Sequence, residues 1–154
     1  MTSTERFSWD RLIQQAESLL EGCSNPVSNA ANLSALLYQE LSGISWVGFY
    51  FKHGETLLVG PFQGKPACVS IALGQGVCGR AAVSRKTLRV ADVDTFDGHI
   101  ACDPEARSEL VVPLVREGEL LGVLDVDSTL LNRFSRHDEA GFNAVAQIYL
   151  SSIV

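Results

Sequence analysis

Three cysteines in the middle third of the chain lie among glycines and acidic residues, outside any long apolar segment. Their local sequences are Pro66-Ala67-Cys68, Gly76-Val77-Cys78-Gly79 and Gly98-His99-Ile100-Ala101-Cys102-Asp103. A cysteine that serves only packing is expected within a hydrophobic strand or helix, because a thiol packs as a small apolar group. Cysteines on turns and loops meet solvent, substrate or another sulfur. The pattern therefore indicates redox or nucleophilic chemistry.

Thiol redox chemistry needs one thiolate that attacks and a second thiol that resolves the oxidised product. Cys102 lies near His99 and Arg107, the two cations of its loop, and either would stabilise a thiolate. Acidic residues in the same loop act in the opposite direction. Cys78 fits both a reactive position and a helix face turned toward the core. Cys23, in a turn between two predicted helices, is expected to have no role.

Three carboxylates lie at the ends of apolar strands. Glu109 begins one such strand, and Asp125 and Asp127 end another. Side chains alternate along a strand, so Asp125 and Asp127 point to the same face. If the three acids are buried together, their pKa values rise until one holds a proton. A neutral acid can donate a hydrogen bond to a polar oxygen, and an ionised one beside it can hold an amine. This combination suits a small zwitterionic substrate; solvated strand ends are the alternative.

Two aromatic residues share one face of a predicted strand. Trp46 and Tyr50 are four residues apart, with Gly48 between them on the same face. A glycine at this position is expected to leave a hollow between the rings. Core packing is the competing interpretation, because aromatic residues on one strand face are common in cores.

Two other motifs point to different chemistry. Residues 74–79 match the pattern G-x-G-x-x-G, but a dinucleotide site requires a parallel βαβ unit, and the segments here are short and linked by hairpins. We therefore expect the glycines to form a tight turn and a helix start. Cys68, Cys78, Cys102 and His99 could ligate zinc, although the sequence has no C-x-x-C pair of the kind typical of structural zinc sites.

The composition predicts one globular domain over residues 1–154. The net charge of −6, without a Lys/Arg-rich block, argues against a nucleic-acid surface. No apolar run approaches the ~20 residues that cross a bilayer, which excludes a membrane span. The polar N-terminal segment 1–6 lacks the features of a signal peptide. We therefore expect a cytoplasmic protein, whose thiols are kept reduced.

Hydrophobic periodicity outlines the elements that must position these residues. Strands joined by tight turns imply an antiparallel sheet, and the helices that flank it in sequence would cover it, which gives an α+β fold. The second helix is expected to be capped at Ser28 or Asn29. Segments 60–66 and 91–108 are expected to be loops, the second of them functional. Helices are predicted over 7–20, 30–41, 77–84 and after the capping box 135–138, and strands over 46–51, 56–59, 69–71, 87–90, 109–116 and 120–126.

The three cysteine contexts, together with the preceding Gly60-Pro61-Phe62-Gln63-Gly64-Lys65, resemble those of the free methionine-(R)-sulfoxide reductases, a family of stand-alone GAF-domain enzymes. The resemblance implies a GAF-like central antiparallel sheet of five to six strands flanked by helices. It implies free L-methionine-(R)-sulfoxide as substrate and no metal or organic cofactor. The matching positions imply the roles of individual residues: Cys102 as nucleophile, Cys68 as resolving cysteine, Cys78 as auxiliary cysteine, Glu109, Asp125 and Asp127 as substrate-binding acids, and Trp46 and Tyr50 beside the substrate methyl group.

The implied cycle begins with attack of Cys102 on the sulfoxide sulfur and leaves a sulfenic acid on that cysteine. Cys68 then condenses with it to a disulfide, and a thioredoxin-type reductant restores both thiols. The sequence leaves the oligomeric state open, and a homodimer through the N-terminal helices is one arrangement that it allows. The alternative function is a non-catalytic GAF-type sensor that binds a small molecule or registers oxidation, since one fold hosts many functions.

Overall fold

A computed structural model describes residues 6–154 of the chain; residues 1–5 of the predicted polar N-terminal segment lie outside the described part. Six strands form one sheet in the order β3-β2-β1-β6-β5-β4, and every neighbouring pair is antiparallel. The predicted α+β fold with five to six antiparallel strands is therefore confirmed. The strands are β1 (Trp46–His53), β2 (Thr56–Gly64), β3 (Ser70–Ala72), β4 (Leu88–Val90), β5 (Ser108–Arg116) and β6 (Glu119–Ser128).

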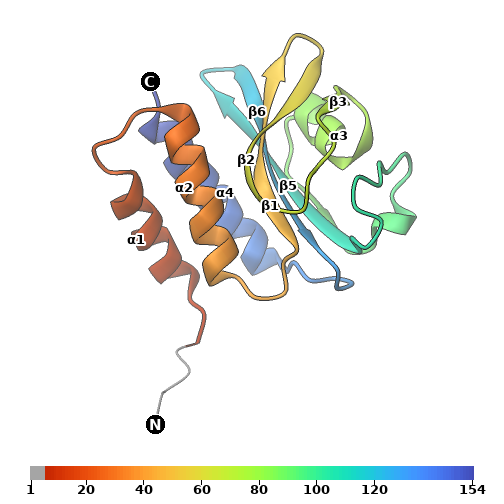
Figure 1. Cartoon of the computed structure of the whole chain (residues 1–154), viewed down its shortest axis with the longest axis horizontal. Helices are drawn as coiled ribbons and strands as arrows, with labels where there is room; N and C mark the ends of the chain where they lie inside the picture. Colours follow the sequence, from red (N-terminus) through yellow and green to blue (C-terminus); the bar gives the residue numbers. More distant parts are fainter. Residues whose placement is uncertain (1–5) are drawn as a thin grey trace.

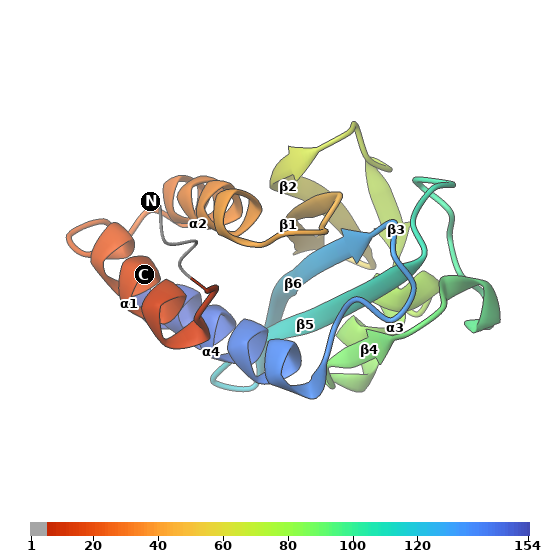
Figure 2. The ribbon, with the colours of Figure 1, turned by 90° about the horizontal axis from the view of Figure 1, so that it is seen from below.

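Helices cover the two faces of this sheet unequally. Helices α2 (Pro26–Glu40) and α4 (Arg136–Ser152) pack on one face, and α1 (Trp9–Leu20) packs on those two helices (Figures 1 and 2). The short helix α3 (Gly76–Ser84) packs on the opposite face against β5 and β6. None of the helices in residues 6–154 combines the length and the apolar character that a bilayer span requires.

Strand alternation divides the buried side chains between two clusters. Along β1, Val47 and Phe49 belong to the larger core beneath α2 and α4, whereas Trp46 and Tyr50 belong to the smaller cluster beneath α3. This follows from the two-residue period of a strand, which sends successive side chains to opposite faces. The smaller cluster is where the predicted functional residues gather, as described below.

The start of α2 differs from the prediction. The side chain of Asn25 accepts hydrogen bonds from the backbone N–H groups of Val27 and Ser28, at 3.0 and 2.9 Å. Pro26 occupies the first turn, where its missing N–H costs nothing. The cap expected at Ser28 or Asn29 was therefore wrong. By contrast, the predicted capping box of α4 is confirmed, because Ser135 and Asp138 cap each other's backbone N–H groups.

Strand β2 extends through the segment that was predicted to be a loop. The pairing of β1 with β2 shifts register between Gly48 and Tyr50, so Gly60 and Pro61 lie in a bulge. A Cβ atom at Gly48 would lie only 2.2 Å from the Cβ of Phe62, so this glycine permits close approach of the two strands. Phe62 therefore fills the hollow that was expected at Gly48, which corrects that prediction.

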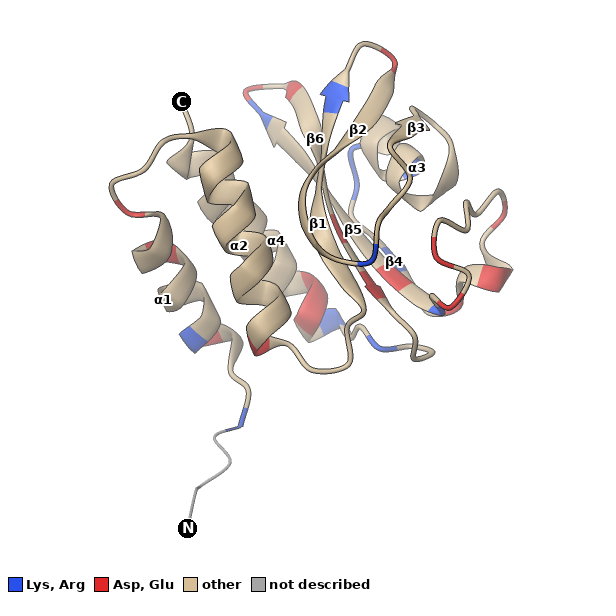
Figure 3. Cartoon of the chain, viewed as in Figure 1, with Lys and Arg blue, Asp and Glu red and all other residues tan. Residues whose placement is uncertain are grey.

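The segment between β4 and β5 is mostly irregular, as predicted. It contains one short 3₁₀ helix, η1 (Val93–Thr95), and the final residue of the expected loop, Ser108, already belongs to β5. Figure 3 shows acidic residues on this segment and on neighbouring strands of the sheet. Ile100 anchors the segment on α3, because its Cγ1 lies 3.1 Å from the position that a Cβ on Gly76 would occupy. The segment thus passes beside the helix that covers the smaller cluster.

Candidate active site

A pocket of about 50 Å³ lies on the α3 face of the sheet. Its walls come from β1, β5, β6 and α3, together with the segments 65–67 and 99–106. All the predicted site residues except Cys68 line it: Trp46, Tyr50, Cys78, Cys102, Glu109, Asp125 and Asp127. Side chains that are far apart in the sequence thus line one pocket.

Cys68 and Cys102 are joined by a disulfide, with their Cα atoms 5.5 Å apart. Cys68 follows β2, and Cys102 belongs to the segment between β4 and β5. The bond therefore ties two irregular segments together at the edge of the pocket. Cys68 reaches the site through this bond to Cys102 without itself lining the cavity.

The two aromatic residues hold the backbone that carries Cys68. The indole Nε1 of Trp46 donates to the carbonyl of Lys65 at 3.1 Å, and the hydroxyl of Tyr50 donates to the carbonyl of Cys68 at 3.0 Å. Trp46 also stacks on Phe62, with ring centroids 5.2 Å apart. Sequence reasoning placed these rings at the site but missed their hydrogen bonds to the 65–68 segment, since nothing local predicts them.

Pairing of β5 with β6 brings the three acids together. Glu109 lies directly opposite Asp127, and Asp125 lies opposite Val111 on the same face. Burial, reinforced by the neighbouring acids, raises the pKa of each carboxyl group well above its usual range. Asp127 keeps partial contact with solvent, so its ionised form is better hydrated than those of Glu109 and Asp125. The site therefore holds carboxyl groups that resist ionisation.

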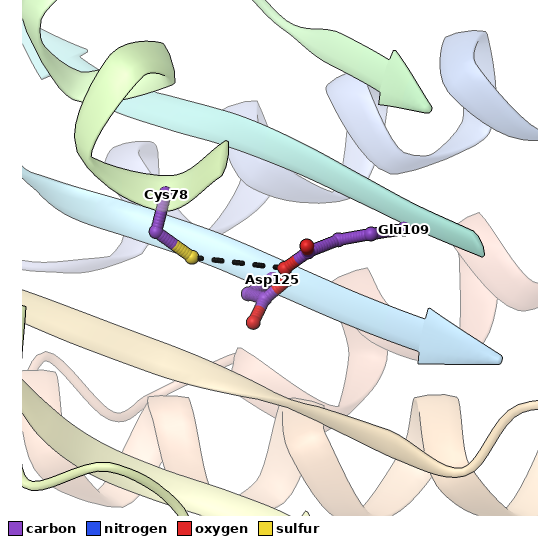
Figure 4. A group of neighbouring side chains, drawn as sticks. All are labelled: Cys78, Glu109 and Asp125. Atoms are coloured by element: carbon purple, nitrogen blue, oxygen red, sulfur yellow. Dashed lines mark hydrogen bonds between the residues drawn. The ribbon is translucent and has the colours of Figure 1, made fainter. Parts of the chain in front are cut away.

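Cys78 faces these acids from the first turn of α3. Its Sγ lies 3.9 Å from Oε2 of Glu109 (Figure 4). A helix N-terminus favours a thiolate, but burial raises the pKa of the Cys78 thiol well above its usual range, and the charges of Asp125 and Glu109 act in the same direction. The interpretation of Cys78 as a helix residue turned toward the core is confirmed, because it belongs to the smaller core cluster. It also lines the pocket, and its reactivity stays a prediction.

His99 is a site residue whose position sequence reasoning left undefined. It lines the pocket, and its Nε2 lies 4.0 Å from Oε1 of Glu109. Burial lowers its pKa, against the opposing charge of Asp94, so the neutral imidazole is favoured. Arg107, the other cation proposed to stabilise a Cys102 thiolate, is exposed and lies outside the residues that line the pocket. Only the histidine of that predicted pair faces the site.

The alternative motifs are explained by the same geometry. Gly74 and Gly76 have positive φ values of 87° and 65°, and a Cβ on Gly79 would lie 2.6 Å from the carbonyl oxygen of Ala72. These glycines serve the turn into α3, and the antiparallel sheet provides no parallel βαβ unit for a dinucleotide. In the disulfide form, Cys68 and Cys102 are unavailable for the four-residue zinc set considered from the sequence.

Comparisons with known proteins agree with this geometry. The sequence profile of the GAF domain matches residues 18–149. The free methionine-R-sulfoxide reductase of Escherichia coli is 46% identical over 149 residues, which cover 96% of this chain and 89% of that protein.

Solved structures show the same likeness at the level of the fold. The fRMsr of Staphylococcus aureus in complex with substrate has a TM-score of 0.92 at 41% identity, over 99% of this chain and 100% of that chain. A Burkholderia vietnamiensis protein named as a GAF sensor has a TM-score of 0.91 at 51% identity, over 94% and 92% of the two chains. From its sequence, fold and relatives, the chain belongs to the GAF domain family and, within it, to the free methionine-R-sulfoxide reductases.

Proposed function

We propose that this protein reduces free L-methionine-(R)-sulfoxide to methionine through a thiol cycle. The observation that carries the proposal is the Cys68–Cys102 disulfide beside a pocket that holds Glu109, Asp125 and Asp127. A redox-active sulfur and neutral carboxyl groups are the two ingredients that sulfoxide reduction by a thiol needs. The E. coli relative is named for this reaction, and the S. aureus structure contains its substrate.

In the first step, the Cys102 thiolate attacks the sulfoxide sulfur. This attack forms a transient bond between the two sulfurs, and the sulfoxide oxygen takes up a proton. The oxygen then moves from the substrate sulfur to the sulfur of Cys102, so that the S–O bond of the substrate and the transient S–S bond both break and methionine leaves. Cys102 is oxidised by two electrons to a sulfenic acid, and the substrate sulfur is reduced by two electrons. Cys68 then attacks the sulfenic sulfur, releasing water and forming the disulfide.

The acids divide two tasks between them. A protonated carboxyl group, Glu109 or Asp127, donates a hydrogen bond to the sulfoxide oxygen and assists its protonation. Help of this kind typically contributes ~10²–10⁴-fold in rate. Another acid of the cluster, in its ionised form, pairs with the substrate ammonium group. Burial supports this division, because it raises the pKa values of the cluster and favours a shared proton at neutral pH.

The walls of the pocket account for the restriction to a small free amino acid. Trp46 and Tyr50 present their rings to the pocket, where they would pack on the substrate methyl group. A residue within a peptide has neither a free ammonium group nor a free carboxylate, and its flanking chain would not fit a pocket of about 50 Å³. The segment 91–108 carries Cys102, so its movement would admit substrate and then expose the disulfide to a reductant.

A thioredoxin-type dithiol completes the cycle. Its thiolate attacks one sulfur of the Cys68–Cys102 bond, and its second thiol releases the reduced enzyme by exchange. The cycle uses no metal or organic cofactor, and Cys78 serves as an auxiliary thiol. A cytoplasmic location of the protein follows from the need for a reducing compartment.

The arrangement of the chain belongs to the same proposal. Every strand of residues 6–154 joins one sheet, which supports a single domain over residues 1–154. Exposed Phe7, Leu19 and Val27 on the N-terminal segments support a homodimer through these helices. Light scattering of the purified protein would test this assembly.

The decisive experiment is NADPH consumption in a thioredoxin-coupled assay, run separately on the two epimers of free methionine sulfoxide. We expect turnover with the R epimer and none with the S epimer. A non-catalytic sensor, the alternative raised from the sequence, would bind ligand without consuming NADPH. That outcome, or equal turnover of both epimers, would overturn the proposal.

A further inference from the structure

Three side chains that line the pocket lie close enough together to share one metal ion. Cys78, Glu109 and Asp125 each offer one ligand atom, and these atoms all lie within 4.8 Å of one another. The side chains come from α3, β5 and β6 and point toward one another (Figure 4). All three are buried, with exposed fractions of 4%, 7% and 4%. They are held on regular elements, which fix their positions better than loops would.

An independent observation is that one oxygen atom of this cluster has no hydrogen-bond partner within residues 6–154. Oδ1 of Asp125 is fully buried and accepts no hydrogen bond from any described residue. A buried carboxyl oxygen without a hydrogen-bond partner is costly, so its position calls for a polar partner or a cation. The ammonium group of the proposed substrate would satisfy the oxygen, but it makes no use of the sulfur 3.9 Å from Glu109. A group that uses sulfur and oxygen together is a borderline-soft metal ion.

We propose that this cluster binds a single zinc ion, with Sγ of Cys78 and one oxygen each of Glu109 and Asp125 as ligands. Hard cations such as Ca²⁺ and Mg²⁺ take oxygen ligands, so a thiolate in the set discriminates against them. His99, whose Nε2 lies 4.0 Å from Oε1 of Glu109, offers a nitrogen donor for a fourth position. Binding of the dication displaces protons from the two carboxyl groups and the thiol, and its charge then offsets the mutual repulsion of the three anions that form.

The observed spacing is close to what such a site needs. Tetrahedral zinc with a Zn–S bond of ~2.3 Å and a Zn–O bond of ~2.1 Å places sulfur and oxygen about 3.6 Å apart. The separation of Sγ of Cys78 and Oε2 of Glu109 is 3.9 Å. A small rotation of either side chain closes the difference. The pocket of about 50 Å³ accommodates an ion of this size together with a water molecule.

Zinc at this position would act as an inhibitor of the chemistry proposed above. It would occupy the carboxyl groups assigned to the substrate ammonium group and displace the proton that the donor acid must supply. This consequence rests on the proposed function, whereas the metal site itself does not. A direct binding measurement therefore separates failure of the site from failure of the reaction.

The test uses the full chain in its disulfide form, in which Cys23 and Cys78 are the free cysteines. Calorimetric titration with Zn²⁺ is expected to show one equivalent bound. The measured heat should differ between buffers of different ionisation enthalpy, because the buffer takes up the protons that binding releases. Titration with Co²⁺ is expected to give a thiolate-to-cobalt charge-transfer band. Ca²⁺ is expected to give no binding heat. These readouts use the unmodified protein and do not depend on the folding of any variant.

Matched variants then identify the ligands. Cys78→Ser should abolish the charge-transfer band and weaken Zn²⁺ binding at least about tenfold, and Glu109→Gln and Asp125→Asn should weaken it similarly. Cys23→Ser is the control and should bind like the unmodified protein. The proposal fails if the disulfide form binds no Zn²⁺ or if Co²⁺ gives no charge-transfer band. It also fails if Cys23→Ser loses binding, or if any of the three ligand variants binds like the unmodified protein.

Discussion

The two faces of the sheet are built from the same strands but meet opposite demands. On the face beneath α2 and α4, β1 and β6 contribute Val47, Phe49 and Leu124 to a continuous apolar core. On the face beneath α3, the same strands present Trp46 and Asp125 to a pocket. The first face buries groups that prefer to be buried, and the second buries carboxyl groups that prefer water. The comparison suggests that burial on the apolar face stabilises the fold enough to offset the cost of burying carboxyl groups on the pocket face.

The largest expected effect is the loss of chemistry on the pocket face without loss of the fold. In Cys102→Ser, methionine formation should fall to the level of a protein-free blank, because serine cannot form a sulfenic acid. The melting temperature of the reduced variant should match that of the reduced parent protein. Methionine is measured by chromatography with Cys23→Ser as control, and repeated turnover by Cys102→Ser would contradict the assignment.

Cys68→Ser should separate the first step of the cycle from its recycling. This variant is expected to release about one equivalent of methionine per protein and then stall, since the sulfenic acid has no resolving thiol. A rapid-quench measurement of methionine gives the size of this burst. If the variant sustains thioredoxin-coupled turnover, Cys68 is not the resolving residue, and Cys78 becomes the candidate.

The helix-covered face should respond to substitution in stability rather than in substrate binding. Leu124→Ala removes a fully buried side chain from that core and should lower the free energy of unfolding by ~2–5 kcal/mol. Urea denaturation measures this loss. The KM of the remaining folded protein should stay close to that of the parent. A large rise in KM would show that the two faces do not act separately.

On the pocket face, the free energy of unfolding should fall as pH rises. This is the opposite of the effect of a carboxylate whose pKa is lowered by folding. The pKa of Asp125 is raised in the folded state, so the native protein binds more protons than the unfolded chain above about pH 4. The contribution of this group to stability is therefore lost as pH rises toward its folded pKa. Asp125→Asn should remove this loss and make the decline in melting temperature with rising pH shallower.

Measurements for Asp125→Asn belong above about pH 8, where His99 is almost entirely neutral in both states. The matched control is Asp97→Asn on the exposed loop, whose carboxylate is fully exposed. This control should retain the slope of the parent protein. An unchanged slope in Asp125→Asn would show that its carboxyl group is not held neutral by burial.

The sequence-based prediction succeeded where local pattern decides the outcome. The two-residue period placed Trp46 with Tyr50 on one face of β1 and Asp125 with Asp127 on one face of β6, and the pairing of the two strands brings both pairs to the same face of the sheet. The capping box located the start of α4. The start of α2 was missed, although Asn25 followed by Pro26 is itself a local signal for a helix start. That error was avoidable from the sequence.

Other features depend on contacts between distant segments. The continuation of β2 past Gly60 depends on a bulge opposite β1, so its glycines and proline resemble a loop when taken alone. The position of His99 beside Glu109 follows from the path of an irregular segment, which periodicity does not describe. The exposure of Arg107 has the same origin. Irregular segments are therefore where sequence reasoning about the site was weakest.

Trp46 and Tyr50 line the pocket and also donate hydrogen bonds to the carbonyls of Lys65 and Cys68. A designer who changes these rings would therefore change both the shape of the pocket and the backbone around Cys68. Under the proposed mechanism, reshaping these rings to admit a bulkier sulfoxide would also release the backbone of residues 65–68, which carries the proposed resolving sulfur. That mechanism therefore couples substrate range to regeneration, so that widening the substrate range without compensation at residues 65–68 would slow regeneration.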